Sequence, residues 1–530
     1  MREETFALGE AYFKAGDLEK ANLLITQVAQ LLGVFSFEET TKPEQQSGSF
    51  SSDGNNTKFQ VVTTSGQENS ESTTCLTNAR NYTLEAKTFR LLERIYLAQR
   101  KNSEALKVAE AGRTIEVDKN IAFNLIQRDS KKLNQVSKEL SRGLTLNEIK
   151  QLSVDEKATI VSYSTTGIAD TGQISIWVIR KGQVHYTTSD LNKIDLSQFS
   201  QVSAADNFDP DRKSKVLMRG VRESLKMSRE KATPAEQQEA KDQQTLQLMA
   251  LYRLLIEPVR DWLPTDPNEH IVFVPHGVLF FVPFPALQNP TTGKYLVDEH
   301  TIRAAPNLRS LYISRQREHR RGKALVVGNP KTAQVDLAGA ALEATTIAQF
   351  FETKQRSVDK FINGDISKEQ VLKKIRDAEI IHLATHGTLD TDSSGSDNTL
   401  KQFAGAIALS PQGNDNGLLT ASEILDLNLN ADLVVLSACD TGKGPLTAGG
   451  VIGLPLSFGL ARVPNVIVSL WAVRDTPTSK LMMEFYDQLL KDPNADKAKA
   501  LRAAMLKIKG MPDYENPVNW AAFTLMGTQR

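Results

Sequence analysis

The stretch HLATHG holds two of the chain's seven histidines, His382 and His386, four positions apart. On a helix this spacing would stack both imidazoles on one face, as in zinc-binding helices. Ile380 and Ile381, however, lead into the pair and indicate a buried strand. Along a strand, positions four apart are separated by roughly 13 Å at about 3.3 Å per residue, so one metal ion cannot bridge them. The pattern predicts no metal site here. Either both histidines are structural, or one works with a partner from elsewhere in the chain.

A candidate partner is Cys439, which stands at the end of the apolar run LVVLSAC. In an open parallel sheet, catalytic groups collect just beyond the carboxyl ends of the strands. His386 and Cys439 both stand at such ends, and an imidazole beside a thiol gives the minimal parts of a cysteine nucleophile and its base. Taken alone, Cys439 would be a small buried residue, since free cysteines are among the most buried. The matched histidine favours catalysis.

These positions predict distinct roles. We expect Cys439 to be the nucleophile and His386 to be the base and later the general acid to the leaving amine. The N–H groups of Gly387 and Cys439 are expected to hold the developing oxyanion. His382, one strand step back inside the apolar run, is expected to support the loop by hydrogen bonding. The sequence has no P-loop and no G-x-S-x-G elbow, and it indicates no cofactor.

Two acidic residues are candidates for a substrate pocket. Asp440 and Asp475 follow apolar strands, where their carboxylates could meet a Lys or Arg side chain before the scissile bond. Each could equally cap a loop or supply a negative charge at a helix N-terminus. The sequence leaves both interpretations open.

The elements that would position these residues lie in the C-terminal part of the chain. From Lys323 onward, apolar strands alternate with helices, which predicts a mostly parallel sheet covered on both faces. The preceding segment begins at residue 145 with a capping-box spacing. It predicts a strand meander with a turn at residues 181–182. The run VPHGVLFFVPFPAL predicts a strand end, a turn at His276-Gly277 and a second short strand.

The N-terminal part has the spacing of tetratricopeptide repeats, which predicts an all-α segment. One copy spans residues 1–35, with a turn at Gly16-Asp17, and a second copy with a closing helix spans residues 85–142, with a turn at Lys101-Asn102. Two unrelated helical hairpins are the alternative. The small and apolar positions are Leu8, Gly9, Tyr12, Ala21, Ile25 and Val28 in the first copy and Leu92, Tyr96, Ala105, Ala109 and Gly112 in the second.

The segment between the copies, residues 36–84, is rich in Ser, Thr, Asn, Gln and Gly and holds Cys75. Such a composition cannot bury enough apolar surface to fold, so we expect low-complexity, unfolded chain there. Stacked repeats need neighbours to cover their apolar faces. Two copies are therefore expected to be the end of a longer array.

Composition gives no indication of several classes of partner, although a local basic patch remains open. Lys and Arg together number 63, as do Asp and Glu, so net charge gives no argument for nucleic acid or an anionic membrane as partner. Neither an apolar run of membrane-spanning length nor a signal peptide is visible. Two cysteines cannot form a disulfide framework, which fits a reducing compartment and predicts a cytoplasmic location.

Several segments resemble the CHAT domain, a caspase-like module that is related to separases and is commonly attached to tetratricopeptide repeats. The run VPHGVLFFVPFPAL resembles its N-terminal half, which is usually catalytically inactive. The resemblance implies an α/β caspase-like sandwich with this half at residues 145–320 and a catalytic half at 321–530. It places the family's catalytic His and Cys on His386 and Cys439. The segments that resemble the catalytic half are IIHLATHG, LVVLSACDTGKG, GVIGLPLSFGLARVPNVIVSLWAVRD and VNWAAFTLMG.

The resemblance implies a regulated cysteine endopeptidase that cleaves a protein or peptide, with the repeats binding a protein partner or sensing a signal. Two departures stand out. Ala448-Gly449-Gly450 replaces a Gly-Glu-Gly that is common in the family, so an acidic side chain is missing near the site. His276 stands where Asp or Asn is common. A catalytically silent interaction scaffold built on the same domains is therefore the alternative function.

Overall fold

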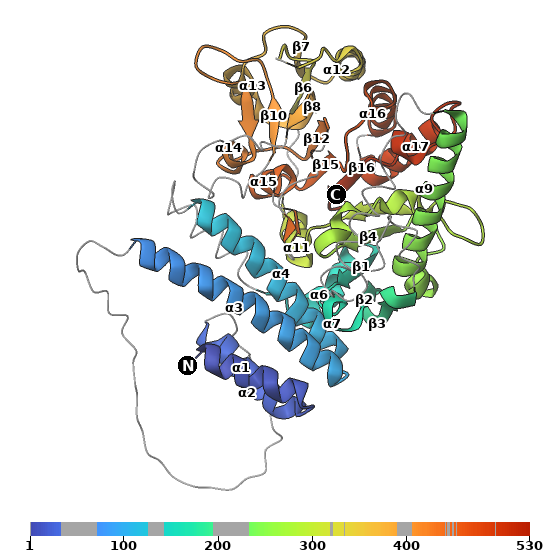
Figure 1. Cartoon of the computed structure of the whole chain (residues 1–530). Helices are drawn as coiled ribbons and strands as arrows, with labels where there is room; N and C mark the ends of the chain where they lie inside the picture. The colour runs from blue at the N-terminus through green and yellow to red at the C-terminus, as the bar shows by residue number, and fades with distance from the viewer. Residues whose placement is uncertain are drawn as a thin grey trace, which may run out of the picture. The chain divides into compact units, whose positions relative to one another are not determined.

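The structure is a computed structural model (Figure 1). The chain divides into two compact units between Lys101 and Asn102. It describes residues 2–32, 71–125, 143–193, 233–317, 322–332, 334–388, 405–439, 441, 446–447, 450–451, 453–492 and 494–529.

The first unit contains a helical hairpin that agrees with the first predicted repeat. Gly16 has a φ of +84° in the turn, and the Asp17 carboxylate caps the second helix by accepting a backbone N–H at 3.1 Å. A Cβ on Gly9 would lie 2.6 Å from Ile25 Cδ1, so the Ile25 side chain would have to shift to admit a larger residue. The helices of this unit are α1 (Arg2–Lys14), α2 (Leu18–Leu31) and α3 (Glu71–Ala98).

The third helix corrects the prediction for residues 36–84. Because α3 begins at Glu71, the end of that low-complexity segment is helical rather than unfolded. Helix α3 also carries buried apolar side chains at Leu84, Phe89 and Leu92, and their packing stabilises the helix. The remainder of the low-complexity segment, from residue 36 to residue 70, lies outside the described residues, and the longer repeat array stays a prediction.

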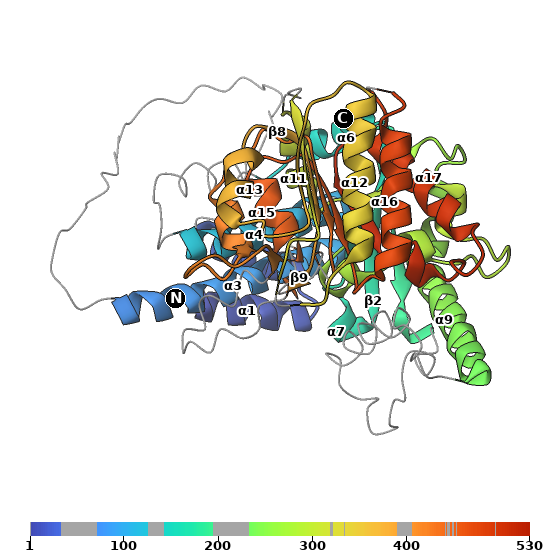
Figure 2. The ribbon, with the colours of Figure 1, turned by 90° about the horizontal axis from the view of Figure 1, so that it is seen from above.

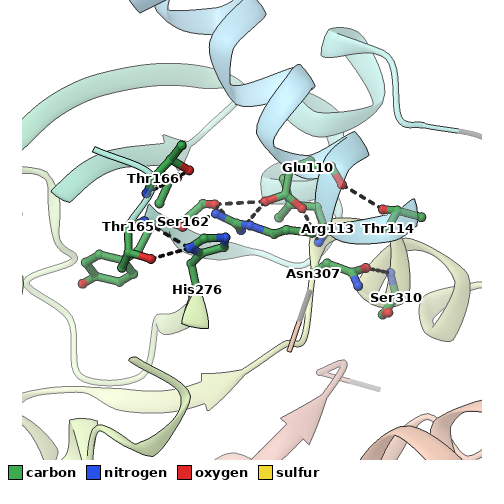
Figure 3. A network of polar contacts seen from close by, with 12 residues as sticks. Glu110, Arg113, Thr114, Ser162, Thr165, Thr166, His276, Asn307 and Ser310 are labelled. Atoms are coloured by element: carbon green, nitrogen blue, oxygen red, sulfur yellow. Dashed lines mark hydrogen bonds and ion pairs between the residues drawn. The ribbon is translucent and has the colours of Figure 1, made fainter. Parts of the chain in front are cut away.

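Helix α4 (Asn102–Leu125) belongs to the second unit, although the sequence assigns it to the second repeat. Its Glu110 and Arg113 form a buried ion pair at 2.6 Å. Glu110 also accepts the hydroxyl hydrogen of Ser162 at 3.0 Å (Figure 3). It further accepts the N–H of Leu308 at 2.9 Å, and Arg113 donates to the carbonyl of Tyr163. The boundary therefore lies between the two helices of the predicted repeat, and not at residue 145.

One mixed sheet of eleven strands runs through the second unit, in the order β3-β2-β1-β4-β5-β16-β15-β12-β8-β6-β7. The meander β1-β2-β3 is antiparallel, as predicted, whereas β12, β8, β6 and β7 are parallel. The strands are β1 (Ala158–Ser164), β2 (Gln173–Arg180), β3 (Gln183–Asp190), β4 (His270–Val274), β5 (Thr301–Ala304), β6 (Lys323–Gly328), β7 (Val358–Ile362), β8 (Ala378–Ala384), β12 (Leu433–Ser437), β15 (Asn465–Ser469) and β16 (Phe523–Gly527).

The last strand joins the two halves of this sheet. Strand β16 pairs antiparallel with β15 on one side and parallel with β5 on the other. The predicted N-terminal and C-terminal halves therefore share one continuous sheet. Two small sheets lie apart from it, formed by β9 (Gly387–Thr388), β10 (Ala406–Ala408) and β11 (Leu418–Thr420), and by β13 (Leu446–Thr447) and β14 (Gly450–Val451).

Helices cover both faces of the C-terminal half, as its apolar strands predict. Figure 2 shows α12 (Ala338–Thr353) and α16 (Asp475–Leu489) on one face, and α13 (Lys368–Ile375) and α15 (Leu454–Leu460) on the other. The core splits accordingly, with Val435 in one apolar cluster and Leu436 in the second. The other helices are α6 (Leu146–Asp155), α7 (Ile168–Thr171), α9 (Pro234–Leu255), α10 (Leu296–Glu299), α11 (Leu308–Arg315), α14 (Ala421–Leu425) and α17 (Lys497–Lys509).

The segment after β4 differs from the prediction. Gly277 has a φ of +55° in the expected turn, but the second short strand is absent, and a 3-10 helix, η5 (Gly277–Phe281), takes its place. Pro283 and Pro285, which lack a donor N–H, account for the failure to form a ladder. His276 is nearly buried, and its Nδ1 accepts the N–H of Thr165 at 3.1 Å (Figure 3). The turn is thus held against the end of β1.

Candidate active site

The register of β8 and β12 places His386 and Cys439 at equivalent positions. The two strands are parallel neighbours, and Ala384 is opposite Ser437. The N–H of Thr385 continues the pairing by donating to the carbonyl of Ser437 at 3.3 Å. His386 and Cys439 each lie two residues beyond the Ala384–Ser437 pair, at the carboxyl ends of adjacent strands. The sequence prediction that these two residues share one edge is therefore confirmed by the sheet.

The backbones beyond these strand ends are in close contact. A Cβ on Gly387 would lie 2.2 Å from the carbonyl oxygen of Cys439, so only glycine fits at this point. The carbonyl of His386 accepts the N–H of Ala408 at 3.0 Å, which holds this segment to β10. Glycine after His386 thus sets the separation of the two loops. The assignment of the oxyanion hole to the N–H groups of Gly387 and Cys439 stays a prediction.

The imidazole of His386 is oriented by a residue that the sequence does not indicate. Its Nε2 lies 2.6 Å from the carbonyl oxygen of Val335, in the loop after β6. A carbonyl can only accept, so Nε2 must carry the hydrogen of this bond. In the neutral ring, Nδ1 then has the free lone pair and is the basic nitrogen. Every residue has a backbone carbonyl, so the residue types in a sequence cannot indicate this contact.

The turn that carries Cys439 is fixed by two hydroxyl side chains. Ser469, at the end of β15, donates its hydroxyl hydrogen to the carbonyl of Ala438 at 2.6 Å. Thr441 donates its N–H to the Ser469 hydroxyl at 3.2 Å and accepts the N–H of Ser469 at 2.9 Å. Cys439 itself is half-buried, and its Sγ lies 3.7 Å from the carbonyl oxygen of Val473. The thiol therefore sits on a turn that is bound to the neighbouring strand.

His382 has a partner on a helix that the sequence does not indicate, and its predicted support of the loop by hydrogen bonding stays a prediction. It is fully buried, and its Nε2 lies 2.8 Å from Oε1 of Glu343 on α12. Burial raises the pKa of the Glu343 carboxyl, against the opposing effect of His382. The ring of Tyr486 on α16 packs edge-on against His382, with centroids 5.3 Å apart. Since its imidazole is enclosed by α12 and α16, His382 anchors these helices to the sheet.

Of the two predicted pocket residues, the structure describes Asp475 but not Asp440. Asp475 is the first residue of α16, and its Oδ2 accepts the N–H of Gly339, in the first turn of α12, at 2.6 Å. A carboxylate at a helix N-terminus stabilises that end of the helix. Asp440 and the Ala448-Gly449 pair lie outside the described residues, so their prediction is unchanged.

Metal and membrane sites are not indicated within the described part of the chain. No group of three or more His, Cys, Asp and Glu side chains there is arranged to hold a metal ion. Among the described helices, none combines the length and apolar character needed to span a bilayer.

A comparison with models of known protein families identifies the family of this chain. The model of the CHAT domain matches residues 245–528, which include β4, β8, β12 and both strand-end residues. The chain belongs to the CHAT domain family. This agrees with the resemblance carried by the HLATHG and SACDTG motifs.

Curated relatives share the CHAT region. Tetratricopeptide repeat protein 28 of Mus musculus is 31% identical over 325 residues, and its Homo sapiens counterpart is 28% identical over 328 residues. Each alignment covers 53% of this chain but 13% of the relative. The matched region is thus a small part of those proteins.

Solved structures agree with the CHAT fold. In a crystal structure of the Saccharomyces cerevisiae separase–securin complex, the matched chain has a TM-score of 0.51 at 11% identity. A second structure of that complex gives a TM-score of 0.50. The alignments cover 97% of this chain and 38% and 37% of those chains. At this identity the likeness concerns the fold alone, a caspase-like sheet preceded by helices.

Proposed function

We propose that this CHAT domain is a cysteine endopeptidase in which His386 and Cys439 form the catalytic dyad. The observation that carries the proposal is the β8–β12 register, which aligns the two residues at one sheet edge with Gly387 against the Cys439 carbonyl. Nucleophile and base must converge in this way for acyl transfer. The Val335 carbonyl supplies the third member by holding Nε2 of His386.

The mechanism follows from the tautomer of His386. Nδ1 takes the thiol proton of Cys439, and the thiolate attacks the scissile carbonyl carbon. The N–H groups of Gly387 and Cys439 stabilise the oxyanion of the tetrahedral intermediate. Collapse of this intermediate breaks the C–N bond as His386 donates its proton to the leaving amine. Water, deprotonated by His386, then hydrolyses the thioester and regenerates the thiol.

For the substrate, we propose a peptide with Lys or Arg before the scissile bond. Asp440 is the preferred acidic residue of the pocket because Asp475 already accepts the Gly339 N–H. The repeats would bind a protein partner or sense the signal that opens the site. A cytoplasmic location rests on the cysteine content and completes the proposal.

A silent interaction scaffold is the second candidate function. It is favoured by Gly449, which replaces the acidic residue common in the family. The intact pair of His386 and Cys439 at matched strand ends favours catalysis instead.

The test compares the purified chain with its Cys439→Ala and His386→Gln variants on a mixed peptide library, with cleavage sites identified by mass spectrometry. We expect cleavage after Lys or Arg by the unaltered chain and none by either variant. Equal cleavage by all three chains would contradict the dyad. No cleavage by any chain, together with no labelling of Cys439 by a thiol-reactive peptide probe, would favour the scaffold.

A further inference from the structure

Asn329 lies at the same sheet edge as the proposed dyad, directly after β6. Strand β6 pairs with β8, and Gly328 is opposite Ala384. The N–H of Asn329 donates to the carbonyl of Ala384 at 2.9 Å, two residues before His386. Asn329 is nearly buried and has a φ of +50°, a left-handed conformation that asparagine tolerates better than most residues. It is therefore held in a fixed place beside the catalytic strand.

The side-chain amide of Asn329 organises the loop that follows it. Its Nδ2 donates to Oδ1 of Asp336 at 2.7 Å and to Oδ1 of Asn363 at 2.9 Å, and its Oδ1 accepts the N–H of Leu337 at 2.9 Å. Both amide hydrogens and the amide oxygen are thus used. The bonds to Asp336 and Leu337 bring the loop back to the strand from which it left.

Val335 lies immediately before these two residues, and it cannot fix its own carbonyl. Its side chain is 80% exposed, so packing of that side chain does not hold the backbone in place. Its carbonyl oxygen nevertheless lies 2.6 Å from Nε2 of His386. The constraint must come from neighbours in the loop. Asp336 and Leu337 provide it through Asn329.

We propose that Asn329 is a positioning residue for the reaction. Through Asp336 and Leu337 it places the Val335 carbonyl, and that carbonyl fixes the Nε2–H tautomer of His386 and leaves Nδ1 as the base. This inference rests on the proposed peptidase function only for its kinetic consequence. The tautomer itself is a property of the folded chain and can be measured without turnover.

The test uses a reversal of the Asn329–Asp336 pair. Asn329→Asp removes both amide donors and sets two carboxylates against each other. The double variant Asn329→Asp with Asp336→Asn restores one donor and one acceptor at the net charge of the unaltered chain. Asn329→Gly removes the side chain while keeping the left-handed φ accessible. Asn414→Asp, at an exposed loop position, is the matched control for one added charge.

The first readout is the tautomer of His386 in nitrogen-15 spectra of the imidazoles, assigned with the His386→Gln variant at a pH where the ring is neutral. We expect Nε2–H in the unaltered chain, the Asn414→Asp control and the double variant. Asn329→Asp and Asn329→Gly are expected to give a mixture with Nδ1–H. A pure Nε2–H signal in both of these folded variants would overturn the proposal.

The second readout is peptide cleavage. Because a displacement of about 1 Å can reduce rate about 100-fold, we expect kcat to fall by that order in the two single variants, with KM unchanged. The double variant should recover most of the rate. Full activity in both single variants would contradict positioning. If the unaltered chain cleaves nothing, the proposed function fails, while the tautomer still decides the role of Asn329.

Discussion

Gly387 and the carbonyl oxygen of Cys439 are so close that a single added methyl group would force their backbones apart. A Cβ on Gly387 would lie 2.2 Å from that oxygen, and backbone, unlike a flexible side chain, yields only by moving a loop. The separation of the proposed base and nucleophile is therefore set by the absence of a side chain at residue 387.

The Gly387→Ala variant tests this contact. We expect a loss of stability of about 1–3 kcal/mol from the steric overlap, and a larger loss of cleavage, about 100-fold, because the dyad is pushed apart. The control is Gly459→Ala, in α15, where a Cβ meets no atom within 4 Å. It should be neutral or slightly stabilising in urea unfolding. Gly387→Ala with unchanged kcat would show that this approach does not set the dyad.

The buried pair of His382 and Glu343 should act on stability rather than on chemistry. His382→Leu leaves the Glu343 carboxylate buried without its imidazole partner, and we expect a loss of about 3 kcal/mol in the free energy of unfolding. The double variant His382→Leu with Glu343→Leu should recover much of it, since an apolar pair needs no ionic partner. Urea titrations measure both. A loss of cleavage per folded molecule in the double variant would indicate a catalytic role for His382.

Asp475 offers a test of the substrate pocket. Because its carboxylate accepts the Gly339 N–H at the start of α12, Asp475→Asn should lower stability by about 1 kcal/mol through a weaker bond to that helix. Cleavage-site preference in the peptide library should stay unchanged, whereas Asp440→Asn should reduce the preference for Lys and Arg. A changed cleavage-site preference in the Asp475→Asn variant would indicate that Asp475 contacts the substrate.

The position of α4 predicts which shortened chains fold. A chain that begins at Asn102 keeps Glu110 and Arg113 and should melt cooperatively. A chain that begins at Gly143 loses both partners of Ser162 and the acceptor of the Leu308 N–H, so we expect aggregation or a broad transition. Calorimetry of the two chains decides between them. Equal melting temperatures would place the domain start after α4.

The pH dependence of stability should carry a contribution from His300. Burial, and then the nearby Arg502, lowers the pKa of His300 from 6.5 to about 4. The unfolded chain therefore binds this proton at a higher pH than the folded chain, and stability is retained above pH 6.5 and lost as the pH falls toward 4. His300→Gln should reduce the loss between pH 7 and pH 4.5 by about 2 kcal/mol. An equal loss in the free energy of unfolding between pH 7 and pH 4.5 in the two chains would refute this assignment.

The sequence predicts the C-terminal half well because its signals are local and strong. The apolar runs before His386 and Cys439 are long enough to identify two buried strands, and parallel strands end at one edge, so their meeting follows from pattern alone. The burial of His382 follows from its place inside the first run. Its partner Glu343 is on a separate helix, and no spacing in the chain links the two residues.

The predictions that fail depend on tertiary contacts. The end of the unfolded segment was placed too late because composition averages over a window, whereas α3 begins at Glu71. Helix α4 has the spacing of a repeat, yet Glu110 and Arg113 bind it to β1 and α11. The contact of the Val335 carbonyl with His386 depends on backbone geometry, which residue types alone do not encode. The partners that decide the place of α4 and the orientation of His386 are distant in the sequence.

The place of β16 in the sheet has a consequence for synthesis of the chain. Strands β8 and β12 leave the ribosome before residue 527 does, but β15 and β5 are joined only when β16 is available. Domains fold as units during synthesis, and pairings between distant segments form late. We therefore expect the nascent chain to carry both strand ends of the dyad in an open, incomplete sheet. On this basis one edge of β15 stays unpaired, and the two halves of the sheet stay separate, until β16 has left the ribosome.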